Sequence, residues 1–345
     1  MERFFQEKFC YRPGIRVLLF VSFLLFASPA PGLPAESLEE GARREGKLMF
    51  HSVLTTKDTN TLTSAFQKKY PFIKVEFWHG SSSANFQRAL REKQMGQSFA
   101  DVLSMVGNYV NLYKKEGLMG RHISPEAKGI DPGFKDPDGF WTANYTAYFT
   151  FIYNTKMVAK KELPKTYEGL LDPRWKRKIG KSNDEVEWFM GMLDFMGEEK
   201  GKQFMRRLAD QDPVLRSGRS LTANLMVAGE FPLALGIVHR TLEQQKEGAP
   251  VEMIPFPVPT LVAMRMIGIG ANPPHPNAAK LFVDFTLSKE GQSTFNRMSR
   301  HPVRTDVPVE PAIEAIRRNL FPIKARDAEV VEGFKKEYDR IFKKR

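Results

Sequence analysis

The sequence predicts an α/β protein with two lobes, each built on a mainly parallel sheet flanked by helices. The chain has 345 residues, of which 42% are hydrophobic, and single hydrophobic cores stop growing near about 250–300 residues. Strand and helix patterns alternate from Gly46 onward, which favours parallel strands covered by helices. An amphipathic helix pair near residue 280 supplies a further apolar face that must be buried.

The first half of the chain alternates short strands with helices. Strand patterns fall at Leu48–Phe50, Ile73–Phe77 and Asp101–Leu103, and helix patterns at Leu62–Tyr70, Phe86–Leu90 and Asn108–Glu116. Between the first strand and the first helix we expect a polar loop, His51–Asn60. The chain becomes loop-like at Asp131-Pro-Gly and Asp136-Pro-Asp-Gly, where we place the first passage between the lobes.

The second half continues the same alternation. Strands are expected at Tyr145–Tyr153, Phe231–Val238 and Val251–Phe256, and helices at Glu185–Met196, Glu198–Ala209, Ser220–Gly229 with Ser220 as its cap, and Arg240–Lys246. Met264–Gly270 would return the chain to the first lobe. The predicted boundaries are residues 46–136 with 264–303 for lobe 1, and residues 137–263 with 304–345 for lobe 2.

The helix pair has clear end signals. Pro273, Pro274 and Pro276 exclude a helix before them, so Asn277 is the expected N-cap. The apolar face is formed by Ala278, Leu281, Phe282 and Phe285. Ser288 is expected to cap the second helix, and the chain leaves it through Arg300-His-Pro-Val-Arg-Thr-Asp306.

The first 35 residues read as an export signal. Four basic residues precede the apolar stretch Val17–Ala27, and small residues and prolines follow, with expected cleavage after Ala30 or Ala35. The stretch is shorter than the roughly 20 residues of a membrane span, so we expect a soluble mature chain. Its only cysteine, Cys10, lies before the apolar stretch, which argues against lipidation and against disulfides in the exported protein.

The formal charge is +12. Residues 1–35 hold four basic and two acidic side chains, so the mature chain keeps +10. Basic clusters at Arg174–Lys178 and Lys343–Arg345 are interpreted as solvated surface, because no nucleic-acid motif accompanies them. The excess supports only a weak attraction for anionic solutes.

Three segments carry a family resemblance. These segments resemble motifs of the extracellular solute-binding proteins of ABC importers, the group that includes the ferric-ion-binding proteins. In chain order they are Asp172–Gly180, Ala228–Ala234, and His275–Gln292 with Pro302–Val307, which is also the order of the motifs in that group. The resemblance runs from about Gly46 to about Val307. It implies a type II periplasmic-binding-protein fold with a ligand cleft between lobes at a hinge.

The resemblance does not carry the iron site. The ferric-binding relatives use a histidine, a glutamate and two adjacent tyrosines, and the matching positions here hold Thr55, Val106, His239 and Arg240. A valine cannot coordinate a metal, and an arginine would repel a trivalent cation. The sequence therefore predicts no metal and no cofactor.

The replaced positions suit an organic anion. Ser52, Thr55 and Thr56 follow the first strand, and Ser81, Ser82 and Ser83 stand where a helix begins, so both groups offer hydroxyls and free amides; one serine of the second group is expected to act as a plain N-cap. From the second lobe we expect Arg219 with Ser220, Arg240 with His239, and Tyr145 with Tyr148 to line the cleft. The alternative is that the arginines are solvated and the tyrosines are core.

The resulting hypothesis is a monomeric periplasmic receptor that captures a small solute and delivers it to an importer permease in the inner membrane. Three alternatives stay open: a ferric or other metal-ion binder, a secreted hydrolase with its nucleophile among Ser81–Ser83, and a periplasmic ligand-sensing partner of a signalling receptor. Gly-x-Ser-x-Gly, P-loop, His-Glu-x-x-His and dinucleotide motifs are absent from the sequence, so we expect no enzyme.

Overall fold

The computed structural model describes residues 37–343. Within this part of the chain, ten strands form one sheet with the order β2-β1-β3-β9-β4-β7-β5-β6, to which β10 is joined beside β9 and β8 beside β4. The strands are β1 (Lys47–Ser52), β2 (Lys74–His79), β3 (Val102–Val106), β4 (Thr142–Asn154), β5 (Ile179–Ser182), β6 (Val214–Arg216), β7 (Leu233–Ile237), β8 (Val251–Met253), β9 (Thr260–Ile269) and β10 (Leu320–Pro322). The chain thus has the predicted α/β class.

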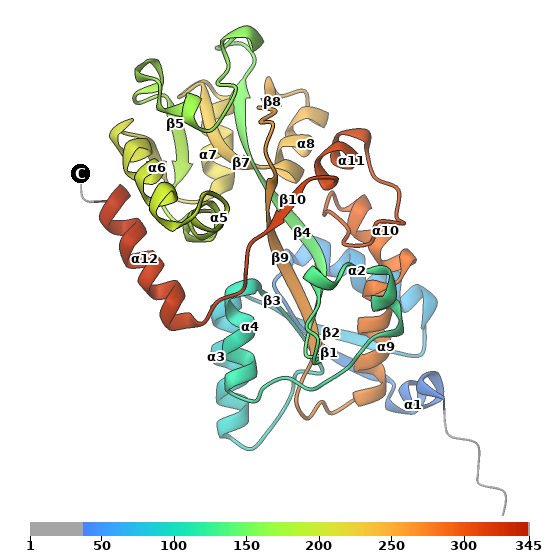
Figure 1. The fold of residues 1–345 in the computed structure, drawn as a ribbon. Helices are drawn as coiled ribbons and strands as arrows, with labels where there is room; N and C mark the ends of the chain where they lie inside the picture. Colours follow the sequence, from blue (N-terminus) through green and yellow to red (C-terminus); the bar gives the residue numbers. More distant parts are fainter. Residues whose placement is uncertain (1–36, 344–345) are drawn as a thin grey trace, which may run out of the picture. The chain divides into compact units, whose positions relative to one another are not determined.

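Twelve α-helices of the described residues cover this sheet (Figure 1). They are α1 (Leu38–Glu45), α2 (Thr56–Lys69), α3 (Ser82–Gln94), α4 (Gly107–Lys115), α5 (Val186–Met196), α6 (Glu198–Asp210), α7 (Arg219–Val227), α8 (Val238–Lys246), α9 (Pro276–Leu287), α10 (Lys289–Arg297), α11 (Pro311–Arg317) and α12 (Ala328–Phe342). None of the described helices combines the length and the apolar character needed to cross a bilayer.

The long strands β4 and β9 run through both halves of the molecule (Figure 1). β4 pairs antiparallel with β9 along Thr142–Tyr148 and then with β7 along Phe149–Tyr153. The remaining strands of each half are parallel: β1 pairs with β2 and β3, and β5 pairs with β6 and β7. The two halves therefore share these two strands.

Buried apolar side chains form two main cores. Core 1 contains Phe50, Phe66, Tyr145 and Phe282 with Met264 of β9. Core 2 contains Phe151, Trp188, Phe189 and Tyr338 with Leu261 of β9. A two-lobe arrangement follows from two cores joined by shared strands, whereas the exact domain boundaries given above stay a prediction.

Most expected elements are present, and the differences concern one expected loop and the caps of helices. The expected loop His51–Asn60 is wrong because β1 extends to Ser52 and Thr55 caps α2 by accepting the Asp58 amide at 3.2 Å. Ser220 is not a cap, since α7 begins at Arg219 after Gly218. The cap at Ser288 is confirmed.

Asn277 is not the N-cap of α9, which already begins at Pro276. The Glu45 carboxylate takes over this role, because it accepts the backbone amides of Asn277 at 3.1 Å and Ala278 at 2.7 Å. Glu45 ends α1, a helix that the sequence analysis did not predict. The predicted export signal, residues 1–35, lies outside the described residues.

Candidate functional site

Six helices begin within a few residues of the end of a strand. α2, α3 and α4 follow β1, β2 and β3, while α5, α7 and α8 follow β5, β6 and β7. Because parallel strands end at the same edge of a sheet, the helix N-termini of each set lie at one edge. Such termini favour anions, so this edge of each half is the first place to search for a site.

The three polar residues after β1 differ in their availability. The hydroxyl of Ser52 is buried and lies 2.8 Å from the hydroxyl of Thr59. Thr55 and Thr56 are exposed, although the Thr55 hydroxyl serves as the cap of α2. Ser52 thus fixes the start of α2, and the binding role of all three stays a prediction.

The three serines before α3 also divide into separate roles. Ser81 is the N-cap and accepts the amide of Ala84 at 3.2 Å, as expected for one of them. Ser82 is buried, and its hydroxyl accepts the amide of Val106 at 3.1 Å, which joins α3 to β3. Ser83 is exposed, so it is the member of the trio with the most freedom to meet a solute.

Tyr145 and Tyr148 are packed side chains on β4. Tyr145 stacks on Phe295 at a centroid distance of 5.2 Å, and Tyr148 stacks on His301 at 4.3 Å with a 10° interplanar angle. Both are less than 10% exposed. Burial raises the pKa of Tyr145, although the positive charges of Arg265 and Arg300 oppose the rise.

Arg219 is held by a buried carboxylate. Its Nε donates to both Glu185 oxygens, at 3.0 and 2.8 Å, and its Nη2 lies 2.7 Å from one of them. The Glu185 side chain is completely buried, whereas 24% of the Arg219 side chain is exposed. The guanidinium therefore lies on the outer side of the pair.

Arg219, Ser220 and Arg240 line one small cavity of about 10 Å³. Arg240 donates to Glu243 at 3.2 Å and to Asn224 at 3.4 Å, while its buried Nε finds no hydrogen-bond partner among residues 37–343. The structure thus brings together three of the residues that the sequence analysis selected from separate motifs.

Two further arginine–carboxylate pairs occur at the same end of the strands. Arg300, which follows α10, donates its Nη2 and Nε to Asp58 of α2 at 2.7 and 3.2 Å. Arg265 of β9 donates to Glu187 of α5 at 3.2 and 3.5 Å. Each guanidinium has five N–H groups, so these carboxylates leave donors unused.

The three arginines act on one histidine. Burial, foremost, and then the positive charges of Arg300, His301, Arg265 and Arg219 hold the pKa of His239 well below its usual range. His239 and His301 lie 5.9 Å apart between ring centroids, and burial lowers the pKa of His301 to about 3. Both rings are therefore neutral at physiological pH.

The sequence analysis missed Arg265, Arg300 and His301 and the carboxylates Asp58, Glu185 and Glu187. Arg300 and His301 stood in the quoted exit segment but were read as a connection. Arg265 is the one charged residue within the otherwise apolar strand β9, Thr260–Ile269. A charged residue inside a buried strand is a signal that could have found it, because such a charge needs a partner.

The four positions that match the ferric ligands do not form a metal site in the described chain. No group of three or more histidine, cysteine or acidic side chains is placed to hold an ion within residues 37–343. Burial, foremost, and the positive charges of Arg300, Arg265 and Arg219 lower the pKa of His239. Positive charges of this kind oppose a trivalent cation.

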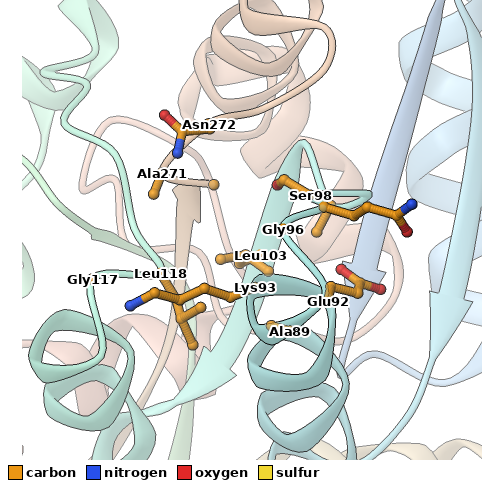
Figure 2. A pocket seen from close by; sticks show the side chains of 13 residues that line it. Ala89, Glu92, Lys93, Gly96, Ser98, Leu103, Gly117, Leu118, Ala271 and Asn272 are labelled. Atoms are coloured by element: carbon orange, nitrogen blue, oxygen red, sulfur yellow. The ribbon is translucent and has the colours of Figure 1, made fainter.

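A much larger cavity lies away from these arginines. It has a volume of about 410 Å³ and is lined by the end of α3, the start of β3 and Gly270–Asn272, with Glu92, Lys93 and Asn272 around it (Figure 2). It sits where β3 begins, whereas the arginines lie near residues that follow strand ends. Glu92 already pairs with Arg88 at 2.9 Å, and Lys93 with the Glu116 carbonyl, so its charged groups are satisfied within the protein.

Known proteins are similar to this chain in sequence and in fold. The chain is 26% identical to a Salmonella typhimurium protein that is provisionally named as a 2-aminoethylphosphonate-binding periplasmic protein, over 250 residues that cover 68% of this chain and 71% of the relative. Iron-bound HitA from Pseudomonas aeruginosa has a similar structure, with a TM-score of 0.74, 21% identity, and coverage of 86% of this chain and 99% of HitA.

A second similar structure is AfuA from Actinobacillus pleuropneumoniae with fructose-6-phosphate bound, with a TM-score of 0.64, 24% identity, and coverage of 87% of this chain and 97% of AfuA. These structures have the two-lobe fold of periplasmic binding proteins. The family of bacterial extracellular solute-binding proteins matches residues 97–323. This match spans more than half of the chain, and the chain therefore belongs to the bacterial extracellular solute-binding proteins.

Proposed function

We propose that this protein captures a small organic anion between its two halves and delivers it to an ABC importer permease in the inner membrane. The observation that carries the proposal is that Arg219, Arg265 and Arg300 are each held by a carboxylate that leaves some of their N–H donors unused. Guanidinium groups bind carboxylates, phosphonates and phosphates through paired, charge-assisted hydrogen bonds. Arg219 lies over Phe149 of core 2. Arg265 stands between two residues of core 1 but pairs with Glu187 on α5 of core 2, and Arg300 is held by α2 of core 1.

This division suits a hinged receptor. A solute that contacts residues of both halves stabilises the closed arrangement to the extent that it prefers that arrangement. Each arginine is already oriented by a carboxylate, so little side-chain entropy is lost when a ligand accepts its remaining N–H groups. Among the predicted site residues, Arg240 and Ser83 best complement the arginines. The Nε of Arg240 has no hydrogen-bond partner among residues 37–343, and Ser83 is exposed.

The carboxylates of the three pairs also bear on the solute. Glu187 and Asp58 are partly exposed, at 26% and 10% of their side chains. An amino group on the solute would contact them while its anionic group contacts the arginines. The name of the Salmonella relative and the fructose-6-phosphate bound to AfuA support a solute with a phosphorus-containing head group as the first candidate.

We infer a binding function without bond chemistry. The hydrolase alternative needs a free serine beside a histidine, yet the hydroxyls of Ser81 and Ser82 accept backbone amides. The metal-ion alternative is supported by the fold shared with HitA but not by the residues around His239. The periplasmic location and the monomeric state belong to the same proposal.

The direct test is to identify what the protein carries when it is purified from periplasm. The purified protein is analysed by native mass spectrometry, then denatured, and the released solute is characterised by mass spectrometry and ³¹P NMR. The proposal expects a small organic anion in stoichiometric amount or, from material stripped by partial unfolding, rebinding of such an anion. A neutral solute, or ferric iron held without an anion, would show that the proposed solute class is wrong.

A further inference from the structure

The C-terminal helix α12 reaches the segment that carries Glu185. Its residue Tyr338 is completely buried and packs against Phe189 of α5 at a centroid distance of 5.8 Å. The Tyr338 hydroxyl donates to the carbonyl of Ser182 at 3.0 Å and accepts from Nζ of Lys181 at 2.6 Å. One hydroxyl thus joins α12 to the carboxyl end of β5.

Lys181 is an unusual partner because it is a buried lysine on a strand. Its Nζ lies 3.4 Å from the ring centroid of Phe342 and 4.3 Å from that of Tyr338. Burial lowers the pKa of Lys181 to about 7, against the attraction of Glu185 and with a smaller repulsion from Lys343. Among residues 37–343, the amine donates its hydrogen bond to Tyr338 and therefore depends on α12 for this acceptor.

The segment from Ser182 to Glu185 connects this contact to the candidate site. The Asn183 backbone amide donates to the backbone carbonyl of Arg216 at 2.9 Å, and the Asp184 backbone amide donates to the Ser182 hydroxyl at 3.3 Å. Glu185 then precedes α5 and holds Arg219 with its side chain. Burial, foremost, and the charge of Glu185 raise the pKa of Tyr338. The Tyr338 hydroxyl therefore holds the Ser182 end of the segment, which leads along the chain to Glu185.

We propose that Tyr338 is a positioning residue for the solute site: its hydroxyl fixes the Ser182–Glu185 segment, and through it the Arg219–Glu185 pair. Tyr338 itself does not contact the solute. The inference rests on the proposed function, since it assigns Arg219 to the solute. Arg300, by contrast, is held by Asp58 on α2.

The test uses this difference between the two arginines. Protein labelled with ¹⁵N-arginine gives Nε–Hε signals for arginines whose Nε donates a stable hydrogen bond, as in Arg219 and Arg300; Arg219→Lys and Arg300→Lys assign the two signals. We expect Tyr338→Phe to shift the Arg219 signal or broaden it beyond detection and to leave the Arg300 signal unchanged. Phe334→Leu, which alters the packing of α12 without removing the hydroxyl, is expected to preserve both signals.

A folded Tyr338→Phe protein with an unchanged Arg219 signal would overturn the inference. If this variant does not fold, the wild-type signals are followed from pH 6 to 9. The charged and titratable groups near Lys181 and Tyr338 are Asp184 and Glu185 before α5, and Asp339 and Lys343 on α12. Deprotonation of Lys181 is expected to move the Arg219 signal but not the Arg300 signal. The variant Lys181→Met is expected to abolish this movement. An Arg219 signal that does not change with pH contradicts the inference. Neither experiment needs a solute, so a failure of this inference is distinguishable from a failure of the proposed function.

Discussion

Glu185 and Arg219 form an asymmetric ion pair, in which a carboxylate with no exposed side-chain surface holds a guanidinium that remains 24% exposed. Two further pairs, Glu187 with Arg265 and Asp58 with Arg300, also join a guanidinium to a carboxylate, although their carboxylates are 26% and 10% exposed. In each pair a carboxylate fixes the direction of an arginine without using all of its donors. The pairs therefore serve both stability and solute recognition, and the two roles are separable by experiment.

Removal of the arginine alone from the first pair should be costly. Arg219→Met leaves the Glu185 carboxylate buried without its partner, and the expected loss in the free energy of unfolding is about 3–5 kcal/mol. The double variant Arg219→Met/Glu185→Gln should recover most of this loss, because the uncompensated charge is gone. Urea unfolding followed by tryptophan fluorescence measures both values. A loss below about 1 kcal/mol, the usual value of an exposed pair, would argue against a buried ionic contact.

An exposed pair provides the matched comparison. Lys115 of α4 lies 3.2 Å from Glu329 of α12, and both side chains are more than 60% exposed. Lys115→Met is expected to change the free energy of unfolding by less than about 1 kcal/mol, because solvent screens such a pair. A loss as large as that of Arg219→Met would show that exposure does not separate the two contacts.

The buried histidines predict a loss of stability in acid. The pKa of His301 is about 3 in the folded protein, below the value of about 6.5 in an unfolded chain. The unfolded state therefore binds more protons between these values, and stability falls as the pH decreases from 6.5 toward 3. His301→Phe keeps a ring against Tyr148 and should reduce the loss between pH 6.5 and 4.5 by roughly 2 kcal/mol.

This prediction is measured by urea unfolding at several pH values. An acid dependence in His301→Phe equal to that of the wild-type protein would contradict it. His239, whose pKa is lowered in the same direction, is left intact in the variant, so some acid dependence remains.

Lys181 predicts a pH dependence in the alkaline range. Its pKa of about 7 in the folded protein lies below the value of about 10.4 for an unfolded lysine. The unfolded chain binds more protons between these values, so the contribution of Lys181 to stability rises as the pH increases from 7 toward 9.5. Lys181→Met should flatten this rise in thermal or urea unfolding, and a rise as steep as in the wild-type protein would contradict the assignment.

Gln292 should be among the more sensitive positions of the helix pair. Its buried amide donates to the carbonyls of Asn144 at 2.7 Å and Thr286 at 2.8 Å and accepts the amide of Val303 at 2.8 Å. Gln292→Ala would leave three backbone groups without this partner, and we expect a loss of about 3–5 kcal/mol in the free energy of unfolding. Ser293→Ala, at the exposed neighbouring position, is the control and should cost less than about 1 kcal/mol.

The sequence predicted the elements better than the site. Apolar periodicity is a local property, so β4, α9 and the cap at Ser288 were recognised from single stretches. The Glu45 carboxylate replaced the expected cap Asn277 because it arrives from a distant part of the chain. Cap assignments at helix ends are open to such long-range partners, which no local pattern reveals.

The site shows the same limit more strongly. Arg219 and His239 could be selected because they stand at helix starts after strands. Asp58, Glu187, Arg265 and Arg300 become one group only through the pairing of β4 with β9 and the packing of α2 and α5. Likewise, Ser52 was expected to follow the first strand but is the last residue of β1. The contact of its hydroxyl with Thr59 depends on side-chain direction, which the sequence does not specify.

The most direct test of the central claim is isothermal titration of the wild-type protein, Arg265→Met and the control Arg174→Met with 2-aminoethylphosphonate, fructose 6-phosphate and inorganic phosphate. Arg174 is half exposed, lies 3.6 Å from Asp172 and stands over the ring of Trp175. We predict that the wild-type protein and Arg174→Met bind at least one of these anions equally well. Arg265→Met should lose about 10- to 150-fold in affinity, the equivalent of a charge-assisted hydrogen bond of about 1.5–3 kcal/mol. Equal affinity in Arg265→Met, or binding of ferric ion by a protein that binds none of the three anions, would contradict the account.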